Sequence, residues 1–344
     1  GKPYFYKYKM IKRILYTLLI MFPVLASAQI NTDRVMAIGR NALYFEDYVL
    51  SIQYFNQVIN AKPYLSDPYF YRGLAKINLD DFQGAESDCS EAIERNPFVV
   101  SAYQVRGLAR IQQNNFAGAI EDYTKALEFD PENIGVWHNM ALCRIRQEDY
   151  KGAKNDLDKL IAISPRYTKA YLMRGEVDLK QKDTLAAEKD FGKAIEIDRY
   201  DADTWASRAI LRLQQQRYKD AEADFDHAIR LSTRNSGVYI NRALARYHQN
   251  NLRGAMSDYD IALDIDPNNF IGHYNRGLLR AQVGDDNRAI QDFNFVIEME
   301  PDNMMAIFNR GLLLDQTGDY KGAIKDYSTV INEYPNFLLG YQYR

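Results

Sequence analysis

Seven prolines lie on a single 34-residue grid, and this spacing limits the fold more than any other feature of the sequence. The grid positions are Pro63, Pro97, Pro131, Pro165, Pro267, Pro301 and Pro335, and only Arg199 and Thr233 interrupt it. No insertion shifts the register over this stretch. A fixed period of about 20–50 residues is typical of solenoids and other repeat architectures, so one small unit is used many times.

Each repeat carries small and aromatic residues at the same positions. With the proline as position 32, the repeats begin at residues 32, 66, 100, 134, 168, 202, 236, 270 and 304. Position 8 is always Gly or Ala, position 20 is Ala in all but the first repeat, and position 24 is mostly aromatic. Small residues let two helices approach closely, while aromatic side chains fill the space around them. Each repeat therefore predicts two helices, with a turn near positions 14–17 and the proline ending the second helix.

These residues resemble the tetratricopeptide repeat family, which has large, small and aromatic residues and a proline at this spacing. Trp137 and Trp205 stand at the family's tryptophan position. The resemblance covers residues 32–335 and implies an all-α, right-handed superhelical solenoid of nine helix-turn-helix units. Stacking is also expected on physical grounds, because one helix pair cannot bury its apolar face alone. A truncated tenth unit begins at residue 338, so we expect the solenoid domain, residues 29–344, to belong to a longer protein.

Residues 1–28 are predicted to be a secretory signal peptide. Lys12 and Arg13 form a basic start, residues 14–25 form a largely apolar run, and small residues lead to an expected cleavage after Ala28. Met10 is the expected start, with residues 1–9 as upstream translated sequence. The apolar run is too short to cross a bilayer as a helix. We therefore expect no membrane span and an exported protein, periplasmic or associated with the outer envelope; a buried N-terminal helix is the alternative.

Composition narrows the class of function. The net charge is −3, and residues 1–28 hold five basic residues and no acid, so the remainder is more acidic still. This balance argues against a nucleic-acid partner. Cys89 and Cys143 lie in different repeats and are expected to be buried, unbridged thiols. The four histidines form no i, i+4 metal-binding pair, and no glycine-rich phosphate loop is present. The sequence therefore predicts no enzymatic activity, cofactor or metal site.

Arginine and aspartate recur at two fixed positions. Position 7 holds Arg72, Arg106, Arg174, Arg208, Arg242, Arg276 and Arg310, and position 23 holds Asp88, Asp122, Asp156, Asp190, Asp224, Asp258, Asp292 and Asp326. An arginine beside the close-packed position 8 should be partly buried and needs a carboxylate. We predict that each arginine pairs with the aspartate of its own repeat, as Arg276 with Asp292; ligand binding is the alternative. The first repeat lacks both residues, which suits the pairing, whereas the fourth places Asp156 opposite Met140, which does not.

Asparagine recurs at position 6, as Asn139, Asn241, Asn275 and Asn309. The resemblance implies that the first helix of each repeat lines a concave groove. The three consecutive asparagines resemble the ladder of O-linked N-acetylglucosamine transferases and armadillo repeats, where the amide grips a peptide backbone. At position 5, Tyr274 and Phe308 are expected to add aromatic contacts. The alternative is that asparagine merely suits a solvated position.

These patterns predict a non-enzymatic interaction scaffold that holds a partner polypeptide in its concave groove, in the bacterial cell envelope. The chaperone-binding type is disfavoured, because the lysine and asparagine that it needs at positions 5 and 9 are missing. A second hypothesis makes the repeats the recruiting arm of a longer protein, whose C-terminal region carries an enzymatic or envelope-anchoring domain. Neither the partner's identity nor the oligomeric state follows from the sequence.

Overall fold

The computed structural model describes residues 30–232 and 234–336, and helix is the only regular secondary structure in them. These residues form eighteen α-helices and no strand, arranged as nine pairs that follow the nine repeats. The predicted all-α solenoid of helix pairs is confirmed. The predicted signal peptide and the start of the tenth unit lie outside the described residues.

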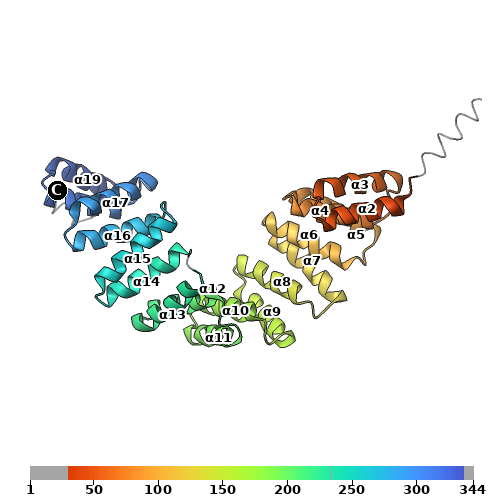
Figure 1. Cartoon of the computed structure of the whole chain (residues 1–344), viewed down its shortest axis with the longest axis horizontal. Helices are drawn as coiled ribbons and strands as arrows, with labels where there is room; N and C mark the ends of the chain where they lie inside the picture. Colours follow the sequence, from red (N-terminus) through yellow and green to blue (C-terminus); the bar gives the residue numbers. More distant parts are fainter. Residues whose placement is uncertain (1–29, 233, 337–344) are drawn as a thin grey trace, which may run out of the picture. The chain divides into compact units, whose positions relative to one another are not determined.

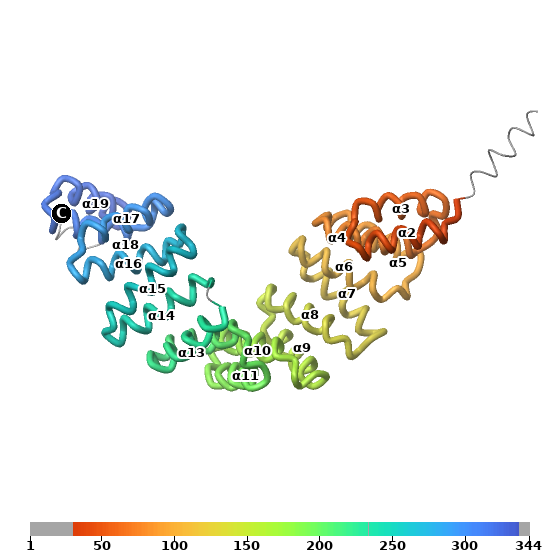
Figure 2. The backbone as a smooth tube through the Cα atoms, in the orientation of Figure 1, coloured from red at the N-terminus to blue at the C-terminus, as the bar shows by residue number. Residues whose placement is uncertain are grey.

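The chain divides into two compact units, one ending at Pro165 and the other beginning at Arg166. The N-terminal unit contains α2 (Thr32–Tyr44), α3 (Tyr48–Ala61), α4 (Asp67–Asn78), α5 (Phe82–Arg95), α6 (Val100–Gln112), α7 (Phe116–Phe129), α8 (Ile134–Arg146) and α9 (Tyr150–Ile163). The C-terminal unit contains α10 (Thr168–Lys180), α11 (Thr184–Ile197), α12 (Ala202–Gln214), α13 (Tyr218–Leu231), α14 (Ser236–His248), α15 (Leu252–Ile265), α16 (Phe270–Gln282), α17 (Asp286–Met299), α18 (Met304–Gln316) and α19 (Tyr320–Glu333). Within each unit, every helix packs on its neighbours in sequence (Figures 1 and 2).

We call the first helix of a repeat helix A and the second helix B. Helix B usually begins after an Asp or Asn whose side chain accepts a hydrogen bond from the backbone three residues on, as Asp81 does from Gly84 at 2.9 Å. Such a cap satisfies one of the free N–H groups of the first turn. The turn between helices A and B has a left-handed residue at position 15. Glycine fills it in the last two repeats, as Gly284 and Gly318, where positive φ is free of steric cost.

The core of each repeat depends on the small residue at position 8. In repeat 8, a Cβ atom added to Gly277 would lie 3.2 Å from the ring of Phe293, which is fully buried. In repeat 3, a Cβ on Gly107 would lie 2.8 Å from the ring of Tyr123. Glycine at position 8 thus allows helix A to rest directly on the aromatic residue at position 24 of helix B.

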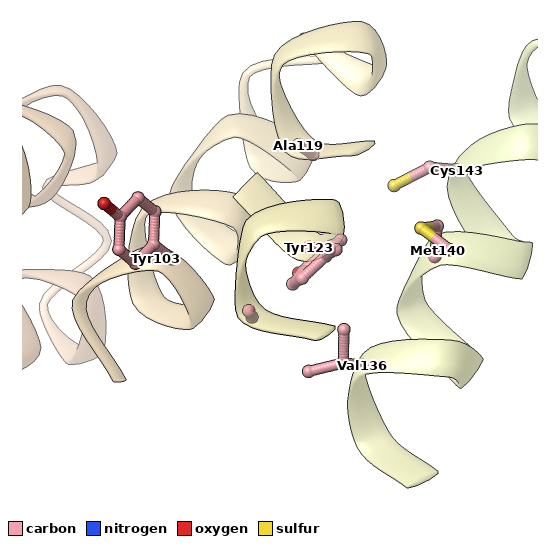
Figure 3. Close-up of a cluster of buried hydrophobic side chains, with 7 residues drawn as sticks. Tyr103, Ala119, Tyr123, Val136, Met140 and Cys143 are labelled. Atoms are coloured by element: carbon pink, nitrogen blue, oxygen red, sulfur yellow. The ribbon is translucent and has the colours of Figure 1, made fainter. Parts of the chain in front are cut away.

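Neighbouring repeats also share a core. In the N-terminal unit, Tyr123 of α7 lies against Val136, Met140 and Cys143 of α8, and all four side chains are buried (Figure 3). Stacking therefore buries apolar surface that a single helix pair would leave exposed.

Candidate functional site

The position 7 arginines bind the aspartates of their own repeats. The seven pairs are Arg72–Asp88, Arg106–Asp122, Arg174–Asp190, Arg208–Asp224, Arg242–Asp258, Arg276–Asp292 and Arg310–Asp326, with shortest N–O distances between 2.6 and 2.8 Å. Most are bidentate, and these aspartates are at most 5% exposed. The pairs lie between helices A and B, where a carboxylate needs a charged partner.

A second cation, which we did not predict, stands at position 11, one turn further along helix A. Six residues at this position reach the position 23 aspartate of their own repeat: Lys76, Arg110, Arg144, Arg212, Arg246 and Arg280. Five of them reach an aspartate of the pairs above, and Arg144 reaches Asp156. In repeat 8, Nη1 of Arg280 is 2.7 Å from Oδ2 of Asp292, the oxygen that also accepts from Nε of Arg276. Their 34-residue spacing was visible in the sequence. Most of these buried aspartates are therefore held by two cations, and in repeat 8 the two share the Oδ2 atom.

Five of these arginines also join their repeat to the one before it, within one unit. The Nη1 atom of Arg276 donates to Asp260 of the preceding helix B at 2.9 Å, and that of Arg106 donates to Ser90 at 3.1 Å. Equivalent links run from Arg72 to Asn56, from Arg242 to Asp226 and from Arg310 to Asn294. The charged ladder is thus a structural seam within and between repeats, and it leaves few arginine donors for a ligand.

Repeat 4 departs from this arrangement. Met140 occupies position 7, and among the described residues Asp156 binds only Arg144, at 2.8 Å. Arg144 is shared with Asp149 at 3.0 Å. Burial raises the pKa of Asp156 to about 6, although Arg144 opposes this shift. One shared arginine does not compensate a buried carboxylate fully.

In repeats 2, 3, 4, 6 and 8, position 4 carries an aromatic ring that contacts the loop before its own helix. Trp137 and Trp205 donate from Nε1 to the carbonyl oxygens of Pro131 and Arg199, at 2.8 and 2.9 Å. The hydroxyls of Tyr69 and Tyr103 make the same contact six residues upstream. His273 replaces them in repeat 8, with Nε2 2.8 Å from the Pro267 carbonyl oxygen and Nδ1 3.0 Å from Asp292. This position ties the inter-repeat loop to helix A.

The opposite side of helix A is open in repeats 6–9. Positions 6, 9 and 13 lie about one turn apart along one face, turned away from the arginines at positions 7 and 11. We call this surface of α12, α14, α16 and α18 the neutral strip. It consists of Ser207, Asn241, Asn275 and Asn309 at position 6, Ile210, Leu244, Leu278 and Leu312 at position 9, and Gln214, His248, Gln282 and Gln316 at position 13.

Two hydrogen bonds link neighbouring helices along the strip. The hydroxyl of Tyr247 on α14 donates to Gln282 on α16 at 2.8 Å, and Asn309 on α18 donates to the hydroxyl of Tyr274 on α16 at 3.3 Å. The side chains of Asn241 and Asn275 are half-buried and make no hydrogen bond within the part of the chain that the structure describes. Their amides are available to a partner.

The other expected groove residues lie in different surroundings. Phe308 is only 8% exposed and packs on Tyr327 at 5.9 Å, so it belongs to the core rather than to an open aromatic contact. Tyr274 is half-buried against Phe293, and burial raises the pKa of its hydroxyl, partly offset by the hydrogen bond from Asn309. Asn139 lies in the N-terminal unit beside the buried Tyr123. Of the six residues, only Phe308 is buried, and the other five are half-buried.

Other reactive groups do not form a site among the residues at 30–232 and 234–336. Cys89 and Cys143 are buried free thiols, and burial raises the pKa of Cys89 to about 12 and that of Cys143 to about 11. A thiol with such a pKa is a poor nucleophile at neutral pH. In the same residues no group of His, Cys, Asp and Glu is arranged to hold a metal ion. Nor does any helix described there have the length and apolar character to cross a membrane.

Comparison with known families identifies the repeat. A profile of the TPR repeat matches residues 107–143. One profile of the tetratricopeptide repeat matches residues 134–167 and 168–201, and a second matches residues 207–270 and 274–336. The chain belongs to the tetratricopeptide repeat family. A comparison with curated proteins found no match.

Solved structures share this fold at low identity. A tetratricopeptide repeat protein from Parabacteroides merdae is 21% identical, with a TM-score of 0.56 over 72% of this chain and 98% of its own. The C-terminal part of a TPR repeat-containing protein from Cytophaga hutchinsonii is 17% identical, with a TM-score of 0.56 over 69% and 97%. A chain from the APC/C hetero-tetramer Cut9–Hcn1 is 14% identical, with a TM-score of 0.57 over 85% and 58%. The fold is that of a protein–protein interaction scaffold, and members of this family are generally non-enzymatic.

Proposed function

We propose that this chain is a non-enzymatic scaffold that holds a segment of a partner polypeptide along the exposed face of helices A in repeats 6–9. The observation that carries the proposal is the pair of half-buried amides of Asn241 and Asn275, which lack hydrogen-bond partners among the described residues. An amide offers two donors and one carbonyl acceptor, which matches the groups of a peptide backbone. Regularly spaced amides suit a polypeptide chain better than a compact small molecule.

The rest of the molecule supports a binding role rather than a catalytic one. The arginines and aspartates that recur in nearly every repeat are used in the seam between helices. The family resemblance points the same way, since the similar chain from the Cut9–Hcn1 structure belongs to a hetero-tetramer. Binding would be spread over several modest contacts, so single substitutions should weaken it gradually.

The test combines three substitutions on the proposed face. The partner is first recovered by cross-linking the full chain in cells and is then produced on its own. Asn241→Ala, Asn275→Ala and Asn309→Ala together should weaken its binding about tenfold or more, measured by calorimetry. The matched control changes Asn60, Asn287 and Asn332, three exposed asparagines on helices B, to alanine. Equal affinity of both triple variants and the wild type would exclude this face as the binding site.

We further propose that the protein acts outside the cytoplasm of a bacterium, because residues 1–28 have the basic, apolar and small-residue order of a signal peptide. Expression of the full chain in a Gram-negative host, followed by fractionation and N-terminal sequencing, tests this. The expected mature protein begins at Gln29 and is found in the periplasmic or outer-envelope fraction. A chain that stays in the cytoplasm with residues 10–28 attached would contradict export.

A further inference from the structure

The chemistry of the neutral strip restricts the kind of partner that it can hold. Its residues are amides, aliphatic side chains, one serine and one histidine, with no acidic residue, lysine or arginine. Ile210 and Leu278 are exposed at 36% and 38%, and Leu244 and Leu312 are half-buried. An aliphatic row therefore runs along the strip with a polar row on each side.

Most charges of these helices A lie on other faces, although the exposed Asp203 lies one turn before Ser207 at the end of the strip on α12. Their arginines at positions 7 and 11 face helix B, where the buried aspartates bind them. The N-terminal edge of the strip is marked by charge, since α10 has Glu176 and Lys180 at the corresponding positions. Loss of hydration raises the pKa of Glu176, and Asp203 adds to this shift. A bare charge is thus already disfavoured at this edge.

We propose that the strip binds an uncharged segment of a partner polypeptide that carries aliphatic side chains. This inference rests on the proposed function and specifies the partner's chemistry. The aliphatic side chains would pack on the position 9 row, and the amides of Asn241 and Asn275 would hydrogen-bond the backbone of the segment. Burying a lysine, arginine or acidic residue on this surface would be unfavourable, because no opposite charge on the strip would compensate its lost hydration.

Neutrality has a direct consequence for the salt dependence of binding. Complexes held by opposite charges weaken as salt screens them, whereas apolar contacts and neutral hydrogen bonds respond little. Affinity of the selected segment should therefore change less than about twofold between about 50 mM and about 500 mM sodium chloride.

The experiment selects from a phage-displayed library of random short peptides with the purified full chain. We expect the enriched peptides to be rich in Leu, Ile and Val and poor in charged residues. A synthetic peptide with the enriched sequence should lose about tenfold or more in affinity when Leu278→Asp is combined with Leu244→Asp. The matched control is Leu185→Asp, since Leu185 is 81% exposed on α11 in the same unit. Leu278→Gln adds a polar but neutral variant, and circular dichroism checks that every variant is folded.

The outcomes separate this inference from the proposed function. One outcome would be enriched peptides that are charged, whose affinity falls steeply with salt and whose binding is lost in the Asn triple variant. This outcome would contradict the inference of an uncharged partner segment but would be consistent with the proposed scaffold function. Binding unaffected by both sets of strip variants, or no enrichment at all, would overturn both. A dimer seen by light scattering and abolished by Leu278→Asp would show that a second copy of the chain is the occupant, which would also overturn the inference.

Discussion

Repeats 4 and 8 place the same buried aspartate in opposite electrostatic surroundings. In repeat 8, Asp292 is bound by Arg276, Arg280 and His273 at 2.8, 2.7 and 3.0 Å. In repeat 4, Asp156 is bound only by Arg144 among the described residues, and burial raises its pKa to about 6. The two carboxylates are similarly inaccessible, at 2% and 6% exposure. The difference shows that burying the ionised carboxylate at position 23 is unfavourable when the arginine at position 7 is missing.

The largest expected effect comes from removing the fully bound carboxylate. Asp292→Asn should lower the free energy of unfolding by about 3–5 kcal/mol at pH 7, because two arginines lose their buried partner. Asp156→Asn, the matched substitution, should leave stability unchanged or raise it slightly. Urea denaturation followed by circular dichroism measures both. Similar losses of stability in the two variants would mean that the position 7 arginine, present in repeat 8 and absent from repeat 4, does not distinguish the two aspartates.

The next effect is the dependence of stability on pH in repeat 4. Asp156 has a pKa of about 6 in the folded chain and about 3.9 when unfolded, so the folded state holds more protons between these values. The favourable contribution is complete below about pH 4 and is lost as pH rises through about 6, a change of at most about 3 kcal/mol.

The measurement is the difference in unfolding free energy between wild type and Asp156→Asn across this pH range. We expect the wild type to lose stability relative to the variant as pH increases. A flat difference would contradict the raised pKa.

Supplying the missing arginine should reverse the contrast. Met140→Arg places a guanidinium opposite Asp156. Thr124 of the preceding helix B would lie beside it, at the position equivalent to Ser90, which accepts a hydrogen bond from Arg106 of repeat 3. We expect a gain of about 1 kcal/mol at pH 7, since the ion pair outweighs the lost packing of a methionine that is 4% exposed. The pKa of Asp156, followed by NMR, should fall toward its usual range. Met140→Leu controls for packing, and a pKa that stays near 6 in the arginine variant would argue against the pairing.

The smallest effect concerns the third partner of Asp292. His273→Tyr introduces the residue found at position 4 of repeats 2 and 3, whose hydroxyl reaches the upstream carbonyl. It keeps the contact to Pro267 and loses that to Asp292, so we expect a cost below about 1 kcal/mol. His273→Ala, which removes both contacts and the stacking on Phe295 at 4.0 Å, should cost more. If thermal unfolding showed the same loss of stability in both variants, the contact with the Pro267 carbonyl oxygen would make no separate contribution to stability.

Much of the architecture follows from residues at a fixed distance within one repeat. The proline grid, the small residue at position 8 and the aromatic residue at position 24 were enough to predict nine helix pairs. The pairing of Arg276 with Asp292 could be predicted because both lie beside the same close contact between helices A and B. The position 11 cations, such as Arg280, repeat at the same spacing, and a search for further charged positions would have found them.

The structure alone decided the features that depend on how successive repeats stack. The link from Arg276 to Asp260 joins one helix A to the preceding helix B. Along the neutral strip, Tyr247 reaches Gln282 in the next repeat, and Asn309 reaches back to Tyr274 in the preceding one. A 34-residue period specifies that helices stack, but the offset between neighbours is set by side-chain packing across their interface. That packing determines which of the recurring residues stay exposed on the surface.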